Sequence, residues 1–293
     1  MARILVVGIA TLDIINSVDG YPAEDAEIRA LASELRRGGN AANTAVVLAQ
    51  LGHACDWAGV LSDDRDGDFI SADLGAFGVG LVHSYRISGG RTPTSYITMN
   101  QRNGSRTIVH YRDLPEYSAT HFETIDLKPY DWLHVEGRQC HETRTMLQFA
   151  RQQRPDLPIS IEIEKPRPDI DILFDFADLL LFSRGFADAG GYPDATALLQ
   201  SVRTQAPETD LVCAWGDDGA WYSDHDSAGS FHVPAVAPTR VVDTLAAGDT
   251  FNAAVIAARC RGLALPESVE YGCRVAGYKC GLHGLNFDAS LPS

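Results

Sequence analysis

The chain has 293 residues, of which 45% are hydrophobic and 22% charged, and its formal net charge is -15. This length and composition predict one large α/β domain with a small appendage. The acidic balance argues against a nucleic-acid partner, which favours a basic face. No apolar run reaches the roughly 18 residues of a membrane span, so we expect no membrane segment and a cytoplasmic location. The six cysteines lie far apart, which indicates reduced core thiols rather than a zinc site.

The first part of the chain predicts strands and helices in mixed order. Segment 3–8 is apolar and does not alternate, as in a buried parallel strand. Segments 13–18 and 26–35 are more polar and alternate, as in a sheet with one exposed face. Helices are expected at 38–52 and 64–78, with a short strand between them at 56–60.

Residues 81–112 change in character, because β-branched and aromatic residues dominate there. The dipeptides Gly89–Gly90 and Asn103–Gly104 predict hairpin turns. We therefore expect a small sheet built from 13–35 and 81–112. The main domain would then comprise residues 1–12, 36–80 and 113–293.

Strand-like and helix-like segments alternate over the rest of the chain. Strands are expected at 130–135, 159–163, 179–182 and 211–215, and helices at 141–152, 193–205, 247–261 and 266–279. Such alternation predicts a mostly parallel sheet with helices on both faces. Ligands of such a sheet bind at the carboxyl ends of the strands.

Three common active-site motifs are absent from the sequence. None of the lysines (Lys128, Lys165 and Lys279) follows a glycine, so there is no P-loop. No G-x-G-x-x-G follows the first strand, and no G-x-S-x-G is present. A phosphate would therefore need a different cradle, and the best candidate is residues 243–252, which read DTLAAGDTFN.

This loop precedes an Ala-rich apolar run and so predicts a helix N-terminus. The small residues Ala246, Ala247 and Gly248 let the backbone approach a ligand, and the free N–H groups attract a phosphate-like anion. Asp249 beside a bound phosphate would be repelled by it. It is explained either as a base that takes a proton from an attacking hydroxyl or as a residue that stabilises the first helical turn.

The pattern D-T-x-A-A-G-D-T-F resembles the C-terminal signature of the ribokinase/PfkB family of carbohydrate kinases. Residues 36–52, RRGGNAANTAVVLAQLG, resemble its glycine-rich N-terminal signature. The commoner signature has glycine in place of Ala246, and alanine makes a strongly positive φ unfavourable there. The segments NGSRTIVHYRDLP, HVEGR, IEIEKPRP and VCAWGDDGA resemble one branch of the family, whose members phosphorylate fructose at C1.

The resemblance implies an α/β, ribokinase-like three-layer fold with a central mostly parallel sheet and a small β-sheet lid. It also implies ATP, magnesium and potassium as cofactors, and a homodimer that forms through the lid. Asp249 would be the catalytic base, the N–H groups of Ala246, Ala247 and Gly248 would hold the γ-phosphate, and Arg106 in the lid would reach the transferred phosphate. A solvated surface role is the alternative for Arg106.

The same resemblance assigns sugar binding to Asp13, Gly39, Asn40 and Asn43. Asn40 and Asn43 are three residues apart and share a helix face, and their amides offer both donors and acceptors to hydroxyl groups. The structural alternatives are a turn-forming Asp13 and an ordinary loop with an N-cap at Gly39–Asn40.

For the nucleotide, the resemblance places the base over Trp215, Gly216 and Gly219 and against the helix Cys273–Gly277. A core role for Trp215 is the alternative. Asp243 and the carbonyl of Leu245 are the implied potassium ligands. The N-x-x-E pair that many relatives carry near magnesium is missing from residues 182–190, so Glu136 and Glu164 are the candidates, through water. Either is equally explained as a structural carboxylate.

These observations predict an ATP-dependent kinase that phosphorylates D-fructose at C1. The same chemistry on another small sugar or a nucleoside stays open, because pocket shape sets specificity. A non-catalytic sugar-binding protein on the same fold is the alternative of a different class.

Overall fold

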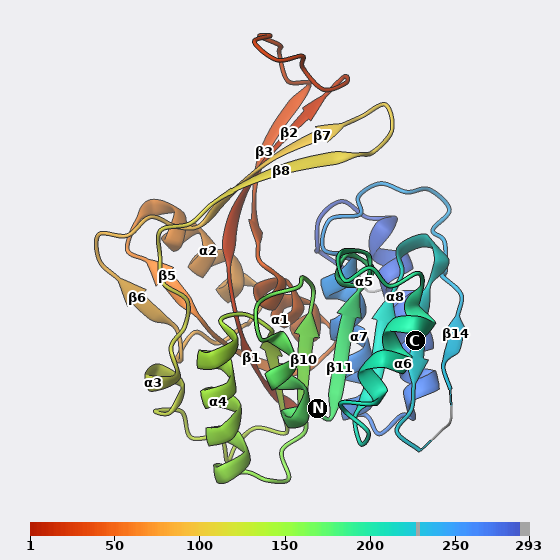
Figure 1. Cartoon of the computed structure of the whole chain (residues 1–293). Coiled ribbons are helices and arrows are strands. Elements are labelled where there is room, and N and C mark those ends of the chain that lie inside the picture. Colours follow the sequence, from red (N-terminus) through yellow and green to blue (C-terminus); the bar gives the residue numbers. More distant parts are fainter. Residues whose placement is uncertain (227–228, 288–293) are drawn as a thin grey trace.

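The computed structural model describes residues 1–226 and 229–287. Its centre is an eight-stranded sheet with the order β14-β13-β12-β11-β10-β9-β1-β4 (Figure 1). All neighbours from β4 to β12 pair in parallel, and the last two pairings are antiparallel. The strands are β1 (Arg3–Val7), β4 (Ala54–Ala58), β9 (Trp132–Glu136), β10 (Ile159–Ile163), β11 (Leu179–Ser183), β12 (Asp210–Ala214), β13 (Ala220–Ser223) and β14 (Phe231–Val233).

Helices cover both faces of this sheet, because most of its strands are apolar on both sides. One face carries α1 (Asn40–Gln50), α2 (Arg65–Ala76), α7 (Ala247–Cys260) and α8 (Leu265–Cys280). The other carries α3 (Ala119–Phe122), α4 (Cys140–Gln153), the 3-10 helix Ile170–Phe176, α5 (Arg184–Ala189) and α6 (Ala195–Arg203). This arrangement confirms the predicted three-layer α/β fold.

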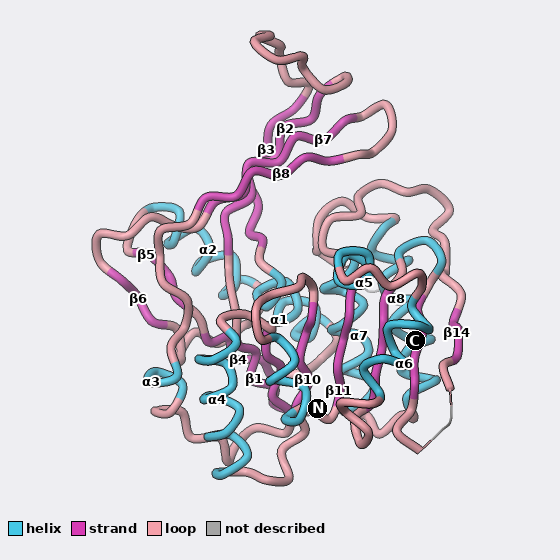
Figure 2. Tube along the Cα trace, in the orientation of Figure 1, coloured by secondary structure: helices cyan, strands magenta, loops and turns pink. Residues whose placement is uncertain are grey.

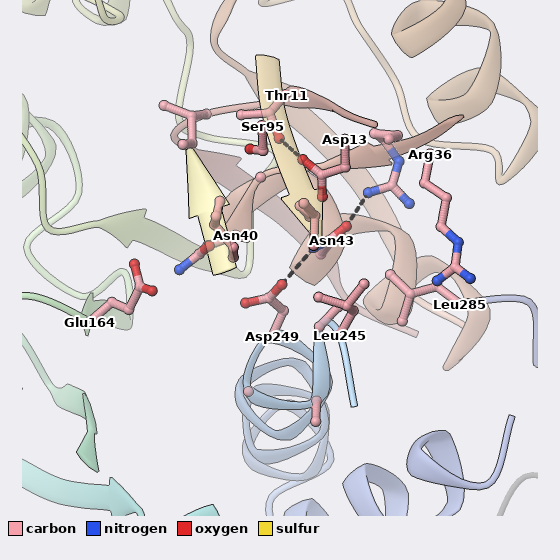
Figure 3. Close-up of a pocket in the computed structure, with 18 of the residues that line it drawn as sticks. Thr11, Asp13, Arg36, Asn40, Asn43, Ser95, Glu164, Leu245, Asp249 and Leu285 are labelled. Carbon is pink, nitrogen blue, oxygen red and sulfur yellow. Dashed lines mark hydrogen bonds between the residues drawn. The ribbon is translucent and has the colours of Figure 1, made fainter. Parts of the chain in front are cut away.

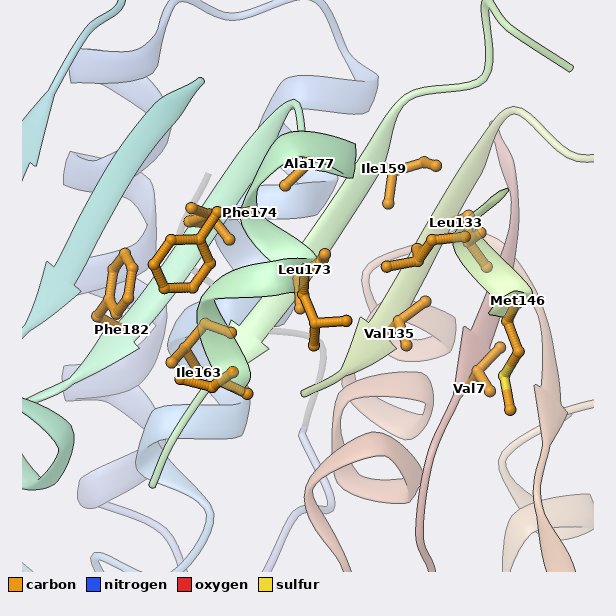
Figure 4. Close-up of a cluster of buried hydrophobic side chains, with 14 of the residues drawn as sticks. Val7, Leu133, Val135, Met146, Ile159, Ile163, Leu173, Phe174, Ala177 and Phe182 are labelled. Atoms are coloured by element: carbon orange, nitrogen blue, oxygen red, sulfur yellow. The ribbon is translucent and has the colours of Figure 1, made fainter. Parts of the chain in front are cut away.

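The core on the α4 side shows how the strands share their residues between the two faces. Val7, Leu133 and Val135 point toward Met146 of α4, while Phe174 packs edge-on against Phe182 with ring centroids 5.8 Å apart (Figure 4). The neighbouring residue Val6 belongs to the opposite core. Side chains of a strand alternate between faces, so one apolar strand serves both layers.

A second, four-stranded sheet projects from the main body and ends in loops (Figures 1 and 2). Its order is β3-β2-β7-β8. The strands are β3 (Ala32–Gly38), β2 (Thr11–Val18), β7 (Thr94–Asn100) and β8 (Arg106–Tyr111). The predicted turn at Asn103–Gly104 joins β7 to its antiparallel neighbour β8, with Gly104 at φ 71°.

Two predictions about this region are wrong. The segment 26–31 is not a strand, because β3 begins only at Ala32. Gly89–Gly90 does not close a hairpin either. The strand before it, β6 (Tyr85–Ile87), pairs in parallel with β5 (Val60–Ser62) in a separate two-stranded sheet. Gly90 is instead held by the Ser62 hydroxyl, which donates to its carbonyl at 2.6 Å, so the dipeptide leads the chain from one sheet to another.

None of the helices in the described part of the chain is long and apolar enough to cross a membrane. The six cysteines all fall within the described ranges and are free; four are buried, and Cys260 and Cys280 are half-buried.

Candidate active site

A cavity of about 700 Å³ lies where the small sheet meets the main domain. Its walls come from both sheets and from the N-termini of two helices, α1 and α7 (Figure 3). Glu136, Glu162, Ser183 and Ala214 line it from the carboxyl ends of β9 to β12. The cavity therefore lies at the edge of the parallel sheet where ligands are expected.

The N-terminus of α7 opens into this cavity. The N–H of Ala247 donates to the Thr244 carbonyl at 3.3 Å, and that of Thr250 donates to Ala246 at 2.9 Å. Among the described residues, the N–H groups of Ala246, Gly248 and Asp249 have no acceptor. The N–H groups left free for an anion at this helix start are therefore those of Ala246, Gly248 and Asp249, whereas the sequence indicated Ala246, Ala247 and Gly248.

Ala246 differs from the expectation in its backbone. It has φ 60° and ψ 17°, a left-handed conformation that alanine rarely adopts. The loop must reverse direction sharply between Leu245 and the first turn of α7, and this residue provides the reversal. The strain is retained at the ligand end of the helix, which is where such strain is commonly found.

Asp249 lies in the first turn of α7 and is only 8% exposed. Asn43 Nδ2 donates to its Oδ2 at 2.6 Å (Figure 3). Burial raises the pKa of Asp249 to about 7, with the negative charges of Glu164 and Glu136 acting in the same direction and the Asn43 hydrogen bond opposing them. A carboxyl group with this pKa can take up a proton near neutral pH.

Asn43 is itself held by a chain of polar contacts that runs to the surface. Arg37 Nη1 donates to Asn43 Oδ1 at 2.5 Å, and Arg37 Nε donates to Asp73 at 2.6 Å. Since Arg37 can only donate, it fixes which end of the Asn43 amide faces Asp249. Asn43 was predicted to bind sugar, and the structure gives its amide a further task, which is to orient the carboxylate.

Asp13 faces the cavity from β2, in the small sheet. The Thr11 hydroxyl donates to its Oδ1 at 2.9 Å (Figure 3). Burial raises the pKa of Asp13, while hydrogen bonds from Thr11 and Ser95 lower it in part. Gly38 on the paired strand leaves the space for this carboxylate, because a Cβ at that position would lie 2.1 Å from Asp13 Oδ2.

A second carboxylate, Glu162, links the two helices and was missed by sequence reasoning. Asn40 on α1 and Asn252 on α7 each donate to Glu162 Oε1 at 3.1 Å. Burial and the charge of Asp249 raise the pKa of Glu162 well above its ordinary value. The signal available in the sequence was spacing: Asn252 follows Asp249 by three residues and so shares its helix face.

The predicted magnesium residues both line the cavity. Glu136 Oε2 accepts the N–H of Ile9 at 2.9 Å, and Glu164 is half-buried beside Lys165 at 3.5 Å. Within the described ranges, the one trio of ligand atoms close enough to hold a metal directly is Asp210, Asp224 and His225, none of which lines the cavity. The carboxylates therefore fit an ion that keeps its waters and is bound partly by phosphate, as Mg²⁺ commonly is.

Arg106 reaches from the small sheet toward residues 243–249, the segment at the start of α7 that we call the anion loop. It lies on β8, and its Nη1 is 3.5 Å from the Thr244 hydroxyl. Both residues line the cavity. The guanidinium thus stands beside the N-terminus of α7, on the side that faces the small sheet.

The residues predicted to hold the nucleotide base divide into two groups. Trp215 is 8% exposed and packs in the core against Trp221, so its ring is not the open platform that the resemblance implied. Cys273 is also buried. Gly216 and Gly219, both at positive φ, end β12 in a short turn.

Gly277 lines a second cavity of about 490 Å³ together with residues 236–240. A Cβ on Gly277 would lie 1.8 Å from the Val236 carbonyl, so only glycine permits this approach of α8 to the loop. Leu282 lines this second cavity and His283 lines the first, which places the two cavities next to each other.

Comparison with known proteins agrees with this architecture. Residues 1–292 match the PfkB family of carbohydrate kinases. The ketohexokinase of Mus musculus is 40% identical over 296 residues, covering 97% of this chain and 98% of that protein. The ribokinase of Bacillus subtilis is 26% identical, covering 94% and 92%.

Solved structures show the same fold. A ribokinase from Cryptococcus neoformans in complex with ADP superposes with a TM-score of 0.80 at 21% identity, covering 97% of this chain and 96% of that chain. The ribokinase of Arabidopsis thaliana complexed with ribose and ATP gives 0.78 at 19% identity, covering 97% and 94%.

The fold and the family match together define a carbohydrate kinase, and the chain belongs to the PfkB family. Within that family it is ketohexokinase-like, by its identity to the mouse enzyme over nearly the full chain.

Proposed function

We propose that this protein phosphorylates D-fructose on its C1 hydroxyl with ATP as the donor. The observation that carries the proposal is the ionisable, buried Asp249 at an open helix N-terminus, in a chain 40% identical to a ketohexokinase. The ionised carboxylate takes the proton of the attacking hydroxyl. The free N–H groups of Ala246, Gly248 and Asp249 bind the terminal phosphoryl group of ATP.

The sugar lies between the small sheet and α1 in this proposal. Asp13 accepts hydrogen bonds from two hydroxyls, and Asn40 with the backbone of Gly39 completes the site. Asn43 keeps Asp249 directed at the reacting hydroxyl. Since phosphoryl transfer has a loose transition state, the protein contributes mainly position and charge, including the charge of Arg106 over the loop.

Magnesium, held with the phosphates and through water by Glu136 and Glu164, neutralises phosphate charge when bound. The nucleotide base lies in the second cavity, between residues 236–240 and Gly277. Leu282 lines that cavity and His283 lines the first, so in this proposal the triphosphate runs from one cavity to the other.

We further propose that the small sheet is a lid and the surface of a homodimer. Every residue of the edge strand β8 is exposed, and the sheet exposes apolar side chains: Leu35, Tyr96, Ile108, Val109 and Tyr111. An exposed apolar sheet with free edges is a surface that proteins ordinarily cover. Val109→Asp is expected to give monomers by light scattering at micromolar concentration, while Val82→Asp, at an even more exposed valine outside this sheet, leaves the dimer intact.

Activity is tested by coupled ADP release with fructose, tagatose, ribose and adenosine as acceptors. Fructose should give the highest kcat/KM, and NMR of the product should show the phosphate on C1. Asp249→Asn should lower kcat by about a thousandfold or more, since it removes the base. Normal turnover by this variant would refute the assignment of the base, and a preference for ribose or adenosine would refute the assignment of the sugar.

A further inference from the structure

Lys279 is a fully buried lysine that the chemistry proposed above does not use. It lies at the end of α8, and its side chain is 0% exposed. Its Nζ donates to the backbone carbonyl of Asp243 at 2.7 Å and lies 3.4 Å from Asp243 Oδ2. A buried ammonium needs such partners, because an unpaired one would be strongly disfavoured.

Both oxygens of the Asp243 carboxylate already have partners. Its Oδ1 accepts the N–H of Leu245 at 2.9 Å, and its Oδ2 accepts the N–H of Gly284 at 3.0 Å and Arg36 Nη1 at 2.5 Å. With Lys279 the carboxylate has four polar contacts, three on Oδ2 and one on Oδ1. The group is 5% exposed and carries two basic partners.

A backbone carbonyl beside it, that of Cys280, is also engaged. The carbonyl of Cys280 accepts the N–H groups of both Val242 and Asp243, at 2.8 and 3.2 Å. A hard cation held by protein needs a shell of roughly six or more oxygen ligands. An added ion at Asp243 would also face the positive charges of Lys279 and Arg36 at short range. The potassium ion implied for Asp243 and Leu245 therefore does not fit this site.

We propose that the ammonium group of Lys279 takes the place of a potassium ion, so that this kinase needs no monovalent cation. The ammonium ties the end of α8 to the loop that leads into α7. Lys279 is thus a positioning residue for the anion loop that ends at Asp249. The inference rests on the proposed kinase activity for its rate measurement, and two further measurements do not depend on that activity.

The first test compares initial rates of the wild-type protein in chloride salts of potassium, sodium and tetramethylammonium at equal ionic strength, with MgATP and fructose. Rates within about twofold of one another are expected. A saturable activation by potassium of tenfold or more would overturn the proposal. If no sugar is phosphorylated under any condition, the proposed function fails and the next two measurements still decide the cation site.

The second test uses crystals soaked in thallium acetate, since thallium replaces potassium and scatters anomalously. No peak is expected within bonding distance of the Asp243 carbonyl, and a peak there would overturn the proposal. The third compares thermal unfolding midpoints in potassium and tetramethylammonium chloride. The wild-type midpoint should be the same in both, and a specific rise in potassium would count against the proposal.

The Lys279→Met variant removes the ammonium and keeps a side chain of similar length. Its kcat should fall at least tenfold in tetramethylammonium and recover in part with potassium or ammonium ions, while the exposed control Lys128→Met behaves as the wild type. A Lys279→Met protein that folds and shows full activity without any added cation would overturn the positioning role. If the variant does not fold, the wild-type measurements stand alone.

Discussion

Asn43 Nδ2 donates to Asp249 Oδ2 at 2.6 Å, and this hydrogen bond joins the N-terminal turns of α1 and α7. The two side chains are 206 positions apart in the chain. One helix carries the sugar-binding candidates and the other carries the candidate anion site. The bond therefore sets the position of Asp249, the proposed base, relative to both candidate sites.

The pH profile should report the ionisation of Asp249. Because its raised pKa is about 7, the carboxylate is largely protonated below that pH and unable to accept a proton. We expect kcat/KM for fructose to rise about tenfold per pH unit up to about pH 7 and then to level off. Asn43→Ala removes the hydrogen bond that lowers this pKa, so its profile should bend at a higher pH. A bend that does not move would show that Asn43 has no influence on the base.

The same ionisation predicts a pH-dependent stability. The folded-state pKa of Asp249 lies above its model value of 3.8, so folding favours the protonated form. This contribution is complete below about pH 4 and is lost as pH rises through 7. Asp249→Asn cannot ionise, so it does not lose this stability at high pH, and its amide oxygen can still accept from Asn43.

We therefore compare the unfolding free energies of Asp249→Asn and the wild type at pH 5 and pH 8. The difference, variant minus wild type, should be larger at pH 8 by on the order of 2 kcal/mol. Urea denaturation at the two pH values measures it. Equal differences at both values would mean that Asp249 ionises normally in the folded protein.

The sequence was sufficient to predict the layers and the helix start that carries Asp249. Strand-like and helix-like segments alternate along the chain and predict β9 to β12 and the helices between them, because the spacing of apolar residues reflects burial directly. The small residues of 246–248 mark the helix start for the same local reason. Strand partners were less accessible: β6 has the composition of its neighbours, yet it pairs with β5 because the intervening helix α2 returns the chain there.

The contacts among site residues could not be obtained from local pattern. Glu162 reads as one residue of an apolar strand, and only the tertiary fold brings it to Asn40 and Asn252. In the sequence, Lys279 is one lysine at the end of a predicted helix, with no sign that it is buried. Its contact with Asp243 joins residues 36 positions apart. Such pairings depend on how the elements pack, which a single sequence does not specify.

Ala246 offers a test of backbone strain. Alanine in the left-handed region costs roughly 1 kcal/mol or more, and glycine would remove that cost while adding about 0.5–1 kcal/mol of chain entropy to the unfolded state. Ala246→Gly should therefore leave stability near or slightly above that of the wild type. The control Ala247→Gly, at the first residue of α7, has no positive φ to relieve and should lose stability, by up to about 0.5–1 kcal/mol. Equal losses in both variants, measured by urea denaturation, would show that Ala246 carries no strain.

Gly38 offers a test of the sugar site that leaves Asp13 itself unchanged. A Cβ on Gly38 would lie 2.1 Å from Asp13 Oδ2, so Gly38→Ala must displace the carboxylate. We expect KM for fructose to rise about tenfold or more with a smaller change in kcat. The control Gly75→Ala has nothing within 4 Å of the added atom and should keep the wild-type KM. An unchanged KM in Gly38→Ala would place the sugar away from Asp13.

Glu162 should act through the two amides that it holds. Glu162→Gln preserves the acceptor for Asn40 and Asn252 and is neutral, so its stability at pH 8 should equal or exceed that of the wild type. Glu162→Leu is similar in size but leaves two amide groups without their acceptor, at about 1–3 kcal/mol each.

The Leu variant should also raise KM for fructose more than the Gln variant does, because Asn40 loses the contact that orients it toward the cavity. Urea denaturation and steady-state kinetics on the pair separate the two effects. If Glu162→Leu matched Glu162→Gln in both stability and KM, the hydrogen bonds from Asn40 and Asn252 would contribute nothing, and the link between α1 and α7 would rest on Asn43 and Asp249 alone.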